Sequence, residues 1–197
     1  MPESRVIVRA AVPAEVEALH ALAALTFPLA CPPSTTEAAK ADFIAEHLSA
    51  QRLAEYLDDP ARLVLVAERA VADGAGAAGQ QPSASGALVG YAMLVHGEPG
   101  DPDVARAVLG RPTAELSKLY VHPAQHGGGV AAALVEAAIA AAAEQGAMSV
   151  WLGVNIHNVR ANRFYEKSGF AIMGEKGFLV GESIEDDWVR ERGIWRD

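Results

Sequence analysis

The sequence has little cysteine and an excess of acidic side chains. Its 197 residues include a single cysteine, Cys31, which excludes an internal disulfide and a cysteine-rich zinc site. Lys and Arg number 16 against 25 Asp and Glu, for a formal net charge of −9. Binding to a phosphate backbone needs a concentrated basic surface, so we expect no nucleic-acid partner. The histidines show no spacing typical of a metal site, and we predict none.

Long apolar runs are also missing. The most apolar helix-like run, from Val130 to Ala143, is interrupted by Glu136 and is shorter than the ~20 residues that cross a bilayer. The first residues lack the basic region and apolar core of a secretory signal. We therefore expect a cytoplasmic protein without a membrane partner.

What is present is typical of a folded enzyme-sized domain. An apolar content of 51% with 21% charged residues favours a globular chain over a disordered one. The length fits one α/β domain over residues 1–197. Residues 71–85 are rich in Gly, Ala and Ser and lie between two apolar runs, so we expect a hairpin with a flexible tip there.

Some segments show the 3.6-residue hydrophobic period of a helix, and others show the two-residue period of a strand. Pro13 precedes a helix, and Ser34 with Glu37 has the spacing of a capping box for a second helix that extends to about Tyr56. Another helix follows the glycines at 127–129, and a short one follows Asn158. Predicted strands cover residues 4–11, 62–70, 86–97, 114–123, 147–155, 171–181 and 186–195. Strand and helix alternate clearly only around the glycines, which predicts a mixed sheet.

The stretch HGGGVAAA, which begins at His126, fits three chemistries. An oxyanion loop of a hydrolase needs a G-x-S-x-G elbow further along the chain, and none follows. A dinucleotide fingerprint needs an acid at the end of the next strand, but residues 149–155 contain none. The third interpretation is a helix start whose backbone N–H groups hold a diphosphate. For the glycines alone, a plain flexible turn is the alternative.

The residues around this stretch carry a family resemblance. Residues 115–138 (ELSKLYVHPAQHGGGVAAALVEAA) and 151–170 (WLGVNIHNVRANRFYEKSGF) together resemble the GNAT superfamily of acetyl-CoA-dependent N-acetyltransferases. The resemblance implies a mixed, mostly antiparallel sheet flanked by helices, within the α/β (α+β) class. It also implies that the backbone of Leu119 and Val121 pairs with the pantetheine arm. The implied acetyl-CoA-binding residues are Leu119, Tyr120, Val121, Gly127, Gly128, Gly129, Val130, Ala131, Ala132 and Asn158.

At a finer level the chain is similar to PaiA-type polyamine acetyltransferases. The similarity rests on residues 151–154 and 164–170, on Thr26 with Phe27, and on Gly174 with Phe178. It implies a small, polyamine-like amine as the acceptor. An acidic stretch could attract such a cation, although a solvated turn is the alternative. That stretch contains Glu182, Glu185, Asp186 and Asp187.

Acetyl transfer to an amine needs a neutral amine, a polarised thioester carbonyl and a proton for the departing thiolate. Glu115, at the start of a predicted strand, is the candidate base. The resemblance places Tyr165 beside the sulfur as the proton donor, and a backbone N–H near Val121 would polarise the carbonyl. Cys31 could carry an acetyl group, but a lone cysteine beside prolines is read as a bystander.

Two other functions stay open on the sequence alone. One is acetylation of a protein N-terminus or lysine, and the other is a binding domain that holds acyl-CoA without turnover. Nothing in the sequence fixes the oligomeric state, so a homodimer is allowed but not required.

Overall fold

The computed structural model describes residues 5–69, 87–180 and 183–194, so the predicted tip at 71–85 lies outside the described residues. The strands are β1 (Val6–Ala10), β2 (Arg62–Arg69), β3 (Leu88–His96), β4 (Thr113–Val121), β5 (Ser149–Asn155), β6 (Ala171–Val180) and β7 (Ser183–Gly193). The helices are α1 (Val16–Thr26), α2 (Glu37–His47), α3 (Ala50–Asp58), α4 (Pro102–Ala107), α5 (Val130–Glu144) and α6 (Val159–Lys167).

The described strands form one sheet in the order β1-β2-β3-β4-β5-β7-β6. Neighbouring strands run antiparallel except β4 and β5, which are parallel and are connected by α5. The predicted mixed, mostly antiparallel sheet is confirmed.

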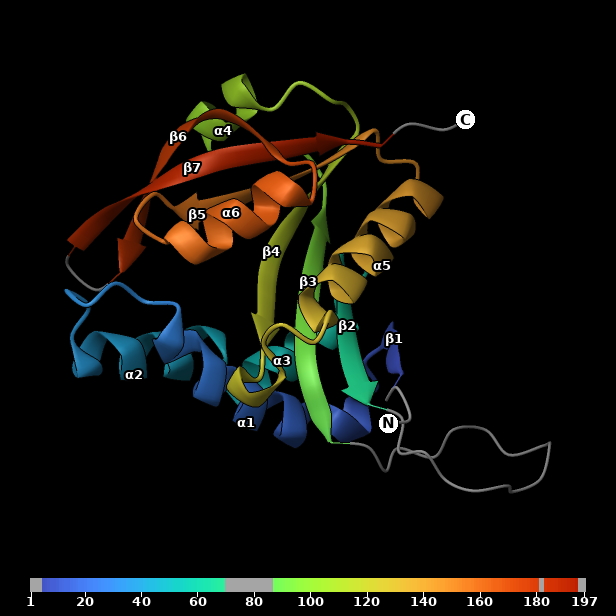
Figure 1. The fold of residues 1–197 in the computed structure, drawn as a ribbon, viewed down its shortest axis with the longest axis vertical. Coiled ribbons are helices and arrows are strands. Elements are labelled where there is room, and N and C mark those ends of the chain that lie inside the picture. Colours follow the sequence, from blue (N-terminus) through green and yellow to red (C-terminus); the bar gives the residue numbers. More distant parts are fainter. Residues whose placement is uncertain (1–4, 70–86, 181–182, 195–197) are drawn as a thin grey trace.

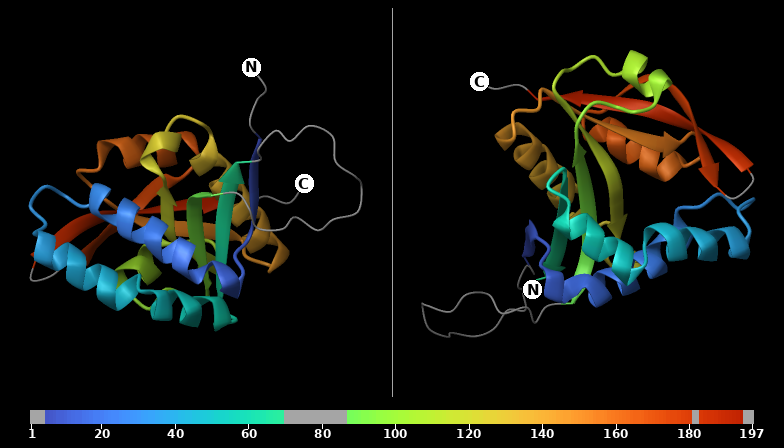
Figure 2. Two further views of the ribbon diagram at one scale, coloured as in Figure 1. Left: turned by 90° about the horizontal axis from the view of Figure 1, so that it is seen from below. Right: turned by 180° about the vertical axis from the view of Figure 1, so that it is seen from behind.

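Helices cover both faces of this sheet. In Figure 1, α5 and α6 lie in front of the strands, and the view from behind in Figure 2 shows α1 and α3 across the other face. Successive side chains of β2 point to opposite faces of the sheet. Leu65 packs in the core beneath α5, whereas Val64 and Val66 pack in the core beneath α1 and α3. Fully burying one such side chain contributes roughly 1.5–3 kcal/mol. The part of β2 that is buried on both faces, residues 64–67, is therefore entirely apolar.

The helices before β2 differ from the prediction in two ways. The predicted cap at Ser34 is wrong, because Thr36 caps α2 by accepting from the Ala39 N–H at 3.1 Å. The helix predicted to reach about Tyr56 is also divided. Ser49 starts α3 by accepting from the Arg52 N–H at 3.3 Å, a local bond that competes with helix continuation. The break leaves Leu48 only 1% exposed in the core beneath α1.

The two halves of the sheet separate along β4. Strand β4 pairs with β5 only from Thr113 opposite Ser149 to Glu115 opposite Trp151. The register with β3 shifts where Met93 faces Lys118 and Leu94 faces Leu116, so Ser117 is the extra residue of a β-bulge. Beyond the bulge the side-chain phase is reversed. Leu116 and Leu119 consequently both face the core beneath α5.

Candidate active site

Two cavities meet where β4 and β5 separate. The first, about 380 Å³, is lined by Val121, Gly127, Gly129, Val130 and Arg160 among others, and we call it the glycine groove. The second, about 260 Å³, is lined by Phe27, Phe43, Glu115, Lys118, Lys176 and Asp187 among others, and we call it the charged cavity. Both are lined by Ala30, Leu119, Tyr120, Asn158, Ala161 and Tyr165. We call these shared residues the junction.

The glycine groove contains a cradle for an anion. Gly127 and Gly129 have φ values of 79° and 78°, in the left-handed region that favours glycine. A Cβ at either position would meet no atom within 4 Å, so the space before the first turn of α5 is open. The N–H groups and dipole of that turn favour negative charge. Gly128 does not line the groove; a Cβ there would collide with Arg69.

The edge of β4 beside the gap offers backbone groups. The His122 N–H donates to the Val89 oxygen of β3 at 2.9 Å. Hydrogen-bonded pairs alternate along an antiparallel ladder, so the N–H and C=O of Leu119 and Val121 point away from β3. The ladder with β5 ends at Glu115, before these residues. An extended molecule can therefore pair with this part of β4 as an added strand.

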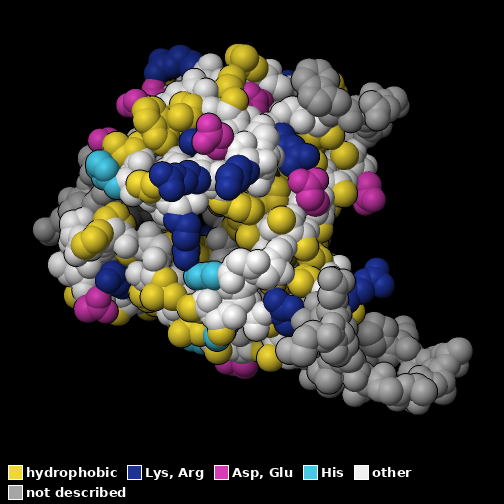
Figure 3. Space-filling view, viewed as in Figure 1, with side chains coloured by type: hydrophobic (Ala, Val, Ile, Leu, Met, Phe, Trp, Pro, Cys, Tyr) yellow, Lys and Arg dark blue, Asp and Glu magenta, His cyan; other side chains and the backbone are white. Residues whose placement is uncertain are grey.

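His126 has a role that the sequence did not reveal. Its Nε2 lies 3.1 Å from the Val121 oxygen and its Nδ1 lies 3.0 Å from Nη1 of Arg160. A neutral ring with its proton on Nε2 satisfies both contacts, since Nε2 then donates and Nδ1 accepts. The ring thus ties the end of β4 to α6 and holds the exposed Arg160 beside the groove. In Figure 3, Lys and Arg side chains gather over α6 next to a hollow in the surface.

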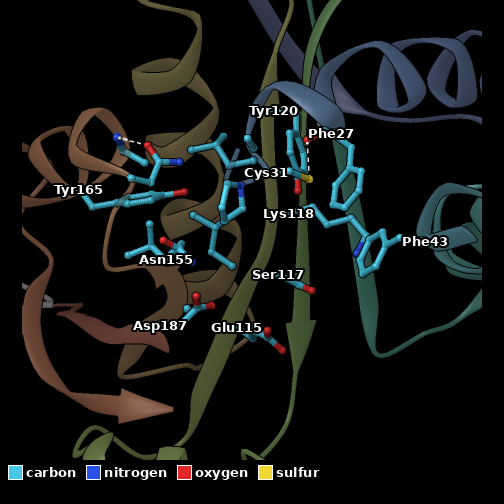
Figure 4. A pocket seen from close by; sticks show the side chains of 18 of the residues that line it. Phe27, Cys31, Phe43, Glu115, Ser117, Lys118, Tyr120, Asn155, Tyr165 and Asp187 are labelled. Carbon is cyan, nitrogen blue, oxygen red and sulfur yellow. Dashed lines mark hydrogen bonds between the residues drawn. The ribbon is translucent and has the colours of Figure 1, made fainter. Parts of the chain in front are cut away.

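Asn158 and Tyr165 reach the junction from α6. The Oδ1 of Asn158 accepts from the Ala161 N–H at 3.1 Å and caps the helix, which leaves its amide nitrogen as the group that can donate to a ligand. Tyr165 packs edge-on against Phe164 and Phe170, at centroid distances of 5.3 and 5.8 Å. Its hydroxyl points into the cavity in Figure 4. Burial raises the pKa of Tyr165, so the phenol keeps its proton at neutral pH.

Four charged side chains line the charged cavity, two of each sign. Glu115 and Lys118 come from β4, Lys176 from β6 and Asp187 from β7. Burial raises the pKa of the Glu115 carboxyl and lowers the pKa of Lys118 to about 8. The opposite wall is apolar, because the rings of Phe27 and Phe43 stack at 4.3 Å (Figure 4). Glu115 is a residue predicted from the sequence, whereas the two lysines are not.

The acidic stretch near the C-terminus is divided by the fold. Asp187 is 7% exposed within the charged cavity, whereas Asp186 is exposed. The side chains of Glu182 and Glu185, and that of Phe178, lie outside the described residues. The stretch therefore contributes one described carboxylate to the cavity, and this carboxylate lies opposite Lys176 in the β6–β7 register.

Cys31 also lines the charged cavity. Its Sγ lies 3.5 Å from the Phe27 oxygen, and burial raises the pKa of the thiol. A raised pKa disfavours the thiolate that a covalent acetyl carrier requires. Within the described ranges, no group of three or more His, Cys, Asp or Glu side chains is arranged to hold a metal ion. In the same ranges, no helix is long and apolar enough to cross a membrane.

Comparison with known proteins identifies the family. The pattern of the acetyltransferase (GNAT) family matches residues 33–170, more than half of the chain. Over 180 residues the chain is 44% identical to an uncharacterized N-acetyltransferase of Mycobacterium bovis, across 91% of this chain and 98% of that protein. The chain belongs to the GNAT family. As a GNAT N-acetyltransferase, it uses acetyl-CoA as its acetyl donor.

Solved GNAT structures share the fold. PaiA N-acetyltransferase of Thermoplasma acidophilum, in complex with coenzyme A, matches with a TM-score of 0.70 at 18% identity, over 96% of this chain and 99% of that chain. NAA60 of Arabidopsis thaliana, in complex with a bisubstrate analogue, matches with a TM-score of 0.64 at 16% identity, over 96% and 99%. The glycine groove of this GNAT enzyme suits the donor, since it combines an anion cradle with a stretch of β4 that β5 does not pair with.

Proposed function

We propose that this GNAT enzyme transfers the acetyl group to a primary amine of a small molecule by direct attack, with donor and acceptor bound together. The observation that carries the proposal is the junction. The glycine groove and the charged cavity share Tyr165 and the backbone of β4, so molecules in the two cavities would meet there. No covalent carrier is needed, which agrees with the protonated state that burial favours for Cys31.

The donor would lie in the glycine groove. Leu119 and Val121 would pair with the pantetheine arm, Asn158 would donate to it, and Tyr120 would contact it through its side chain. Gly127, Gly129, Val130, Ala131 and Ala132 would surround the diphosphate, and all of them line the groove. Gly128 would act indirectly, by allowing the loop to pass close to Arg69. When bound, acetyl-CoA supplies an activated acetyl thioester.

The residues at the other cavity would manage protons and charge. Glu115 would accept a proton from the ammonium group of the acceptor, a task that its raised pKa favours. Tyr165 would donate its proton to the departing thiolate. The N–H of Val121 faces the gap and would polarise the carbonyl oxygen. These roles need no metal ion.

The size of the charged cavity supports a small acceptor, because about 260 Å³ is at the lower end for ligand pockets. A polyamine is the acceptor that the finer sequence similarity favours. Acetylation of a protein N-terminus or lysine is the second candidate, and a domain that binds acyl-CoA without turnover is the third. The two acidic residues and two lysines that line the cavity give it no net negative charge to attract a polycation.

Two measurements on the full chain test the proposal. Calorimetry with acetyl-CoA should show binding, and thiol release should accelerate on addition of at least one amine from a panel of polyamines, simple amines, amino acids and short peptides. Absence of binding would overturn the donor assignment. Binding without thiol release for any amine would favour the non-catalytic domain, and release with peptides alone would favour the protein acetyltransferase.

A further inference from the structure

Lys118 differs from the other cations near the charged cavity because no acidic side chain of the described residues forms an ion pair with it, and Glu115 attracts it only from a distance. Arg62 forms an ion pair with Asp59 at 2.8 Å, and Lys176 lies opposite Asp187, with both side chains next to Gly153. Lys118 makes no ion pair or hydrogen bond with any described residue. The nearest group that holds it is the ring of Tyr56, with Nζ 5.5 Å from the centroid, and Arg62 already covers that ring at 4.7 Å.

Glu115 is a negatively charged side chain that also lacks an ion pair. It lines the same cavity, and within the described chain its carboxylate accepts no hydrogen bond and makes no ion pair. Glu115 and Lys118 belong to one strand, one on each side of the bulge at Ser117. Each charge shifts the pKa of the other, but the two side chains form no ion pair in the described structure. The cavity therefore presents one positive and one negative group that are both open to a ligand.

Packing alone does not explain this arrangement. A partly buried charge without an ion pair costs desolvation energy, and an apolar residue of similar length would pack as well against Tyr56. The desolvation is evident in Lys118, because burial lowers its pKa to about 8. A bound anion would compensate the charge, much as an ion pair compensates it elsewhere in the molecule.

On the basis of the proposed acetyl transfer, we propose that the acceptor is an amine that also carries a carboxylate, which Lys118 binds while Glu115 faces the ammonium group. The stacked rings of Phe27 and Phe43 would cover the apolar part of such a molecule. A polyamine fits less well, because its second ammonium group would lie against Lys118. The proposal thus names Lys118 as a residue that determines specificity.

Matched acceptor pairs test this directly. Thiol release from acetyl-CoA is measured with L-phenylalanine against 2-phenylethylamine, L-leucine against 3-methylbutylamine, 4-aminobutyrate against propylamine, and spermidine. The members of a pair differ in the carboxylate alone, apart from chirality. For at least one pair we expect kcat/KM to be about tenfold or more higher for the zwitterion, the effect of one charge-assisted hydrogen bond.

Substitution of Lys118 identifies the group responsible. Lys118→Met should raise KM for the zwitterion and bring the ratio of kcat/KM between zwitterion and plain amine close to one, and Lys118→Arg should retain much of that ratio. Lys118→Gln serves if the methionine variant does not fold. Arg106→Met is the matched control, because it removes a cation from the exposed surface of α4.

The outcomes separate this inference from the proposed function. Acetylation of plain amines or spermidine as efficiently as zwitterions, or a preference that survives in both Lys118→Met and Lys118→Gln, would overturn the inference and leave acetyl transfer intact. No thiol release with any of these amines or with short peptides, despite acetyl-CoA binding, would overturn both.

Discussion

The glycine groove and the charged cavity are built in different ways, although they share a wall. The groove uses backbone groups from one continuous stretch, residues 119–132, with α6 as its far side. The charged cavity uses side chains from separate parts of the chain: the segment after α1, then α2, β4, β5, α6, β6 and β7. A backbone-built site depends on φ values and on a helix start. A site built from side chains depends on each charge and on the fold that assembles them.

The difference shows in what each region tolerates. Around the groove, His126 lies beside the backbone cradle and contacts the Val121 oxygen and the Arg160 side chain. The charged cavity depends on four individual side chains, two from β4 and one each from β6 and β7. We expect substitutions in the cavity to change catalysis and those around the groove to change donor affinity.

The largest effect is expected at the junction. Tyr165→Phe keeps the ring contacts with Phe164 and Phe170 but removes the proton donor. It should lower kcat by ~10²-fold or more, the range for a general acid, with little change in acetyl-CoA affinity. Single-turnover kinetics measures the rate of acetyl transfer, and calorimetry measures the affinity for acetyl-CoA. Equal turnover in the two proteins would remove Tyr165 as the acid.

Glu115→Gln should lower kcat/KM by about thirtyfold, less than a fully engaged base because a water chain can replace it in part. The acid limb of the wild-type pH profile should lie above the ordinary carboxyl range, since burial raises the pKa of Glu115. That limb should vanish in the variant. An unchanged profile would assign the limb to another group.

The same substitution should affect stability in a pH-dependent way. A raised pKa gives stability that is present below the carboxyl pKa of the unfolded chain and is lost as the pH rises through the folded value. At neutral pH the wild type has lost it, so Glu115→Gln should increase Tm there and leave it nearly unchanged in acid. Thermal melts across this range give the comparison.

Gly129→Ala should weaken acetyl-CoA binding by about tenfold, because its Cβ enters the cradle and the left-handed backbone is strained by ~1–2 kcal/mol. Gly146→Ala is the matched control: φ there is 86°, but the residue follows the far end of α5. Both variants should lose similar stability, and only the first should lose affinity. Equal affinity losses would mean that the cradle is not the diphosphate site.

The smallest effect is expected for the pair of His126 and Arg160. Either residue changed to alanine should weaken acetyl-CoA binding about threefold, as expected for one exposed hydrogen bond. If His126 acts by positioning Arg160, the double variant should be no weaker than the single ones. Additive losses in the calorimetric cycle would show that the two side chains act independently.

Much of the fold and of the groove could be predicted from the sequence, because both rest on local patterns. The sheet class followed from strand and helix periods, and the cradle followed from the glycines before an apolar helix. The cap at Ser34 failed because Thr36 offers the same hydroxyl two residues later. The charged cavity could not be predicted in the same way, since Lys118 and Asp187 meet only through the sheet order.

One signal for the cavity was present. Strand β4 carries Glu115 and Lys118 among apolar neighbours in ELSKLY, and charges in a buried strand are unusual without a function. Their orientation depends on the bulge at Ser117, which no local pattern marked. The sequence could therefore name candidate residues without stating which cavity they line.

The short ladder between β4 and β5 has a mechanical consequence. Three paired positions join the four strands β1 to β4 to the three strands β5 to β7, which form the two halves of the sheet. A donor that pairs with Leu119 and Val121 would continue this pairing along the rest of β4. Its binding would therefore link the two halves of the sheet more firmly. The amide protons of Leu119 and Val121 should exchange with solvent more slowly when the donor is bound.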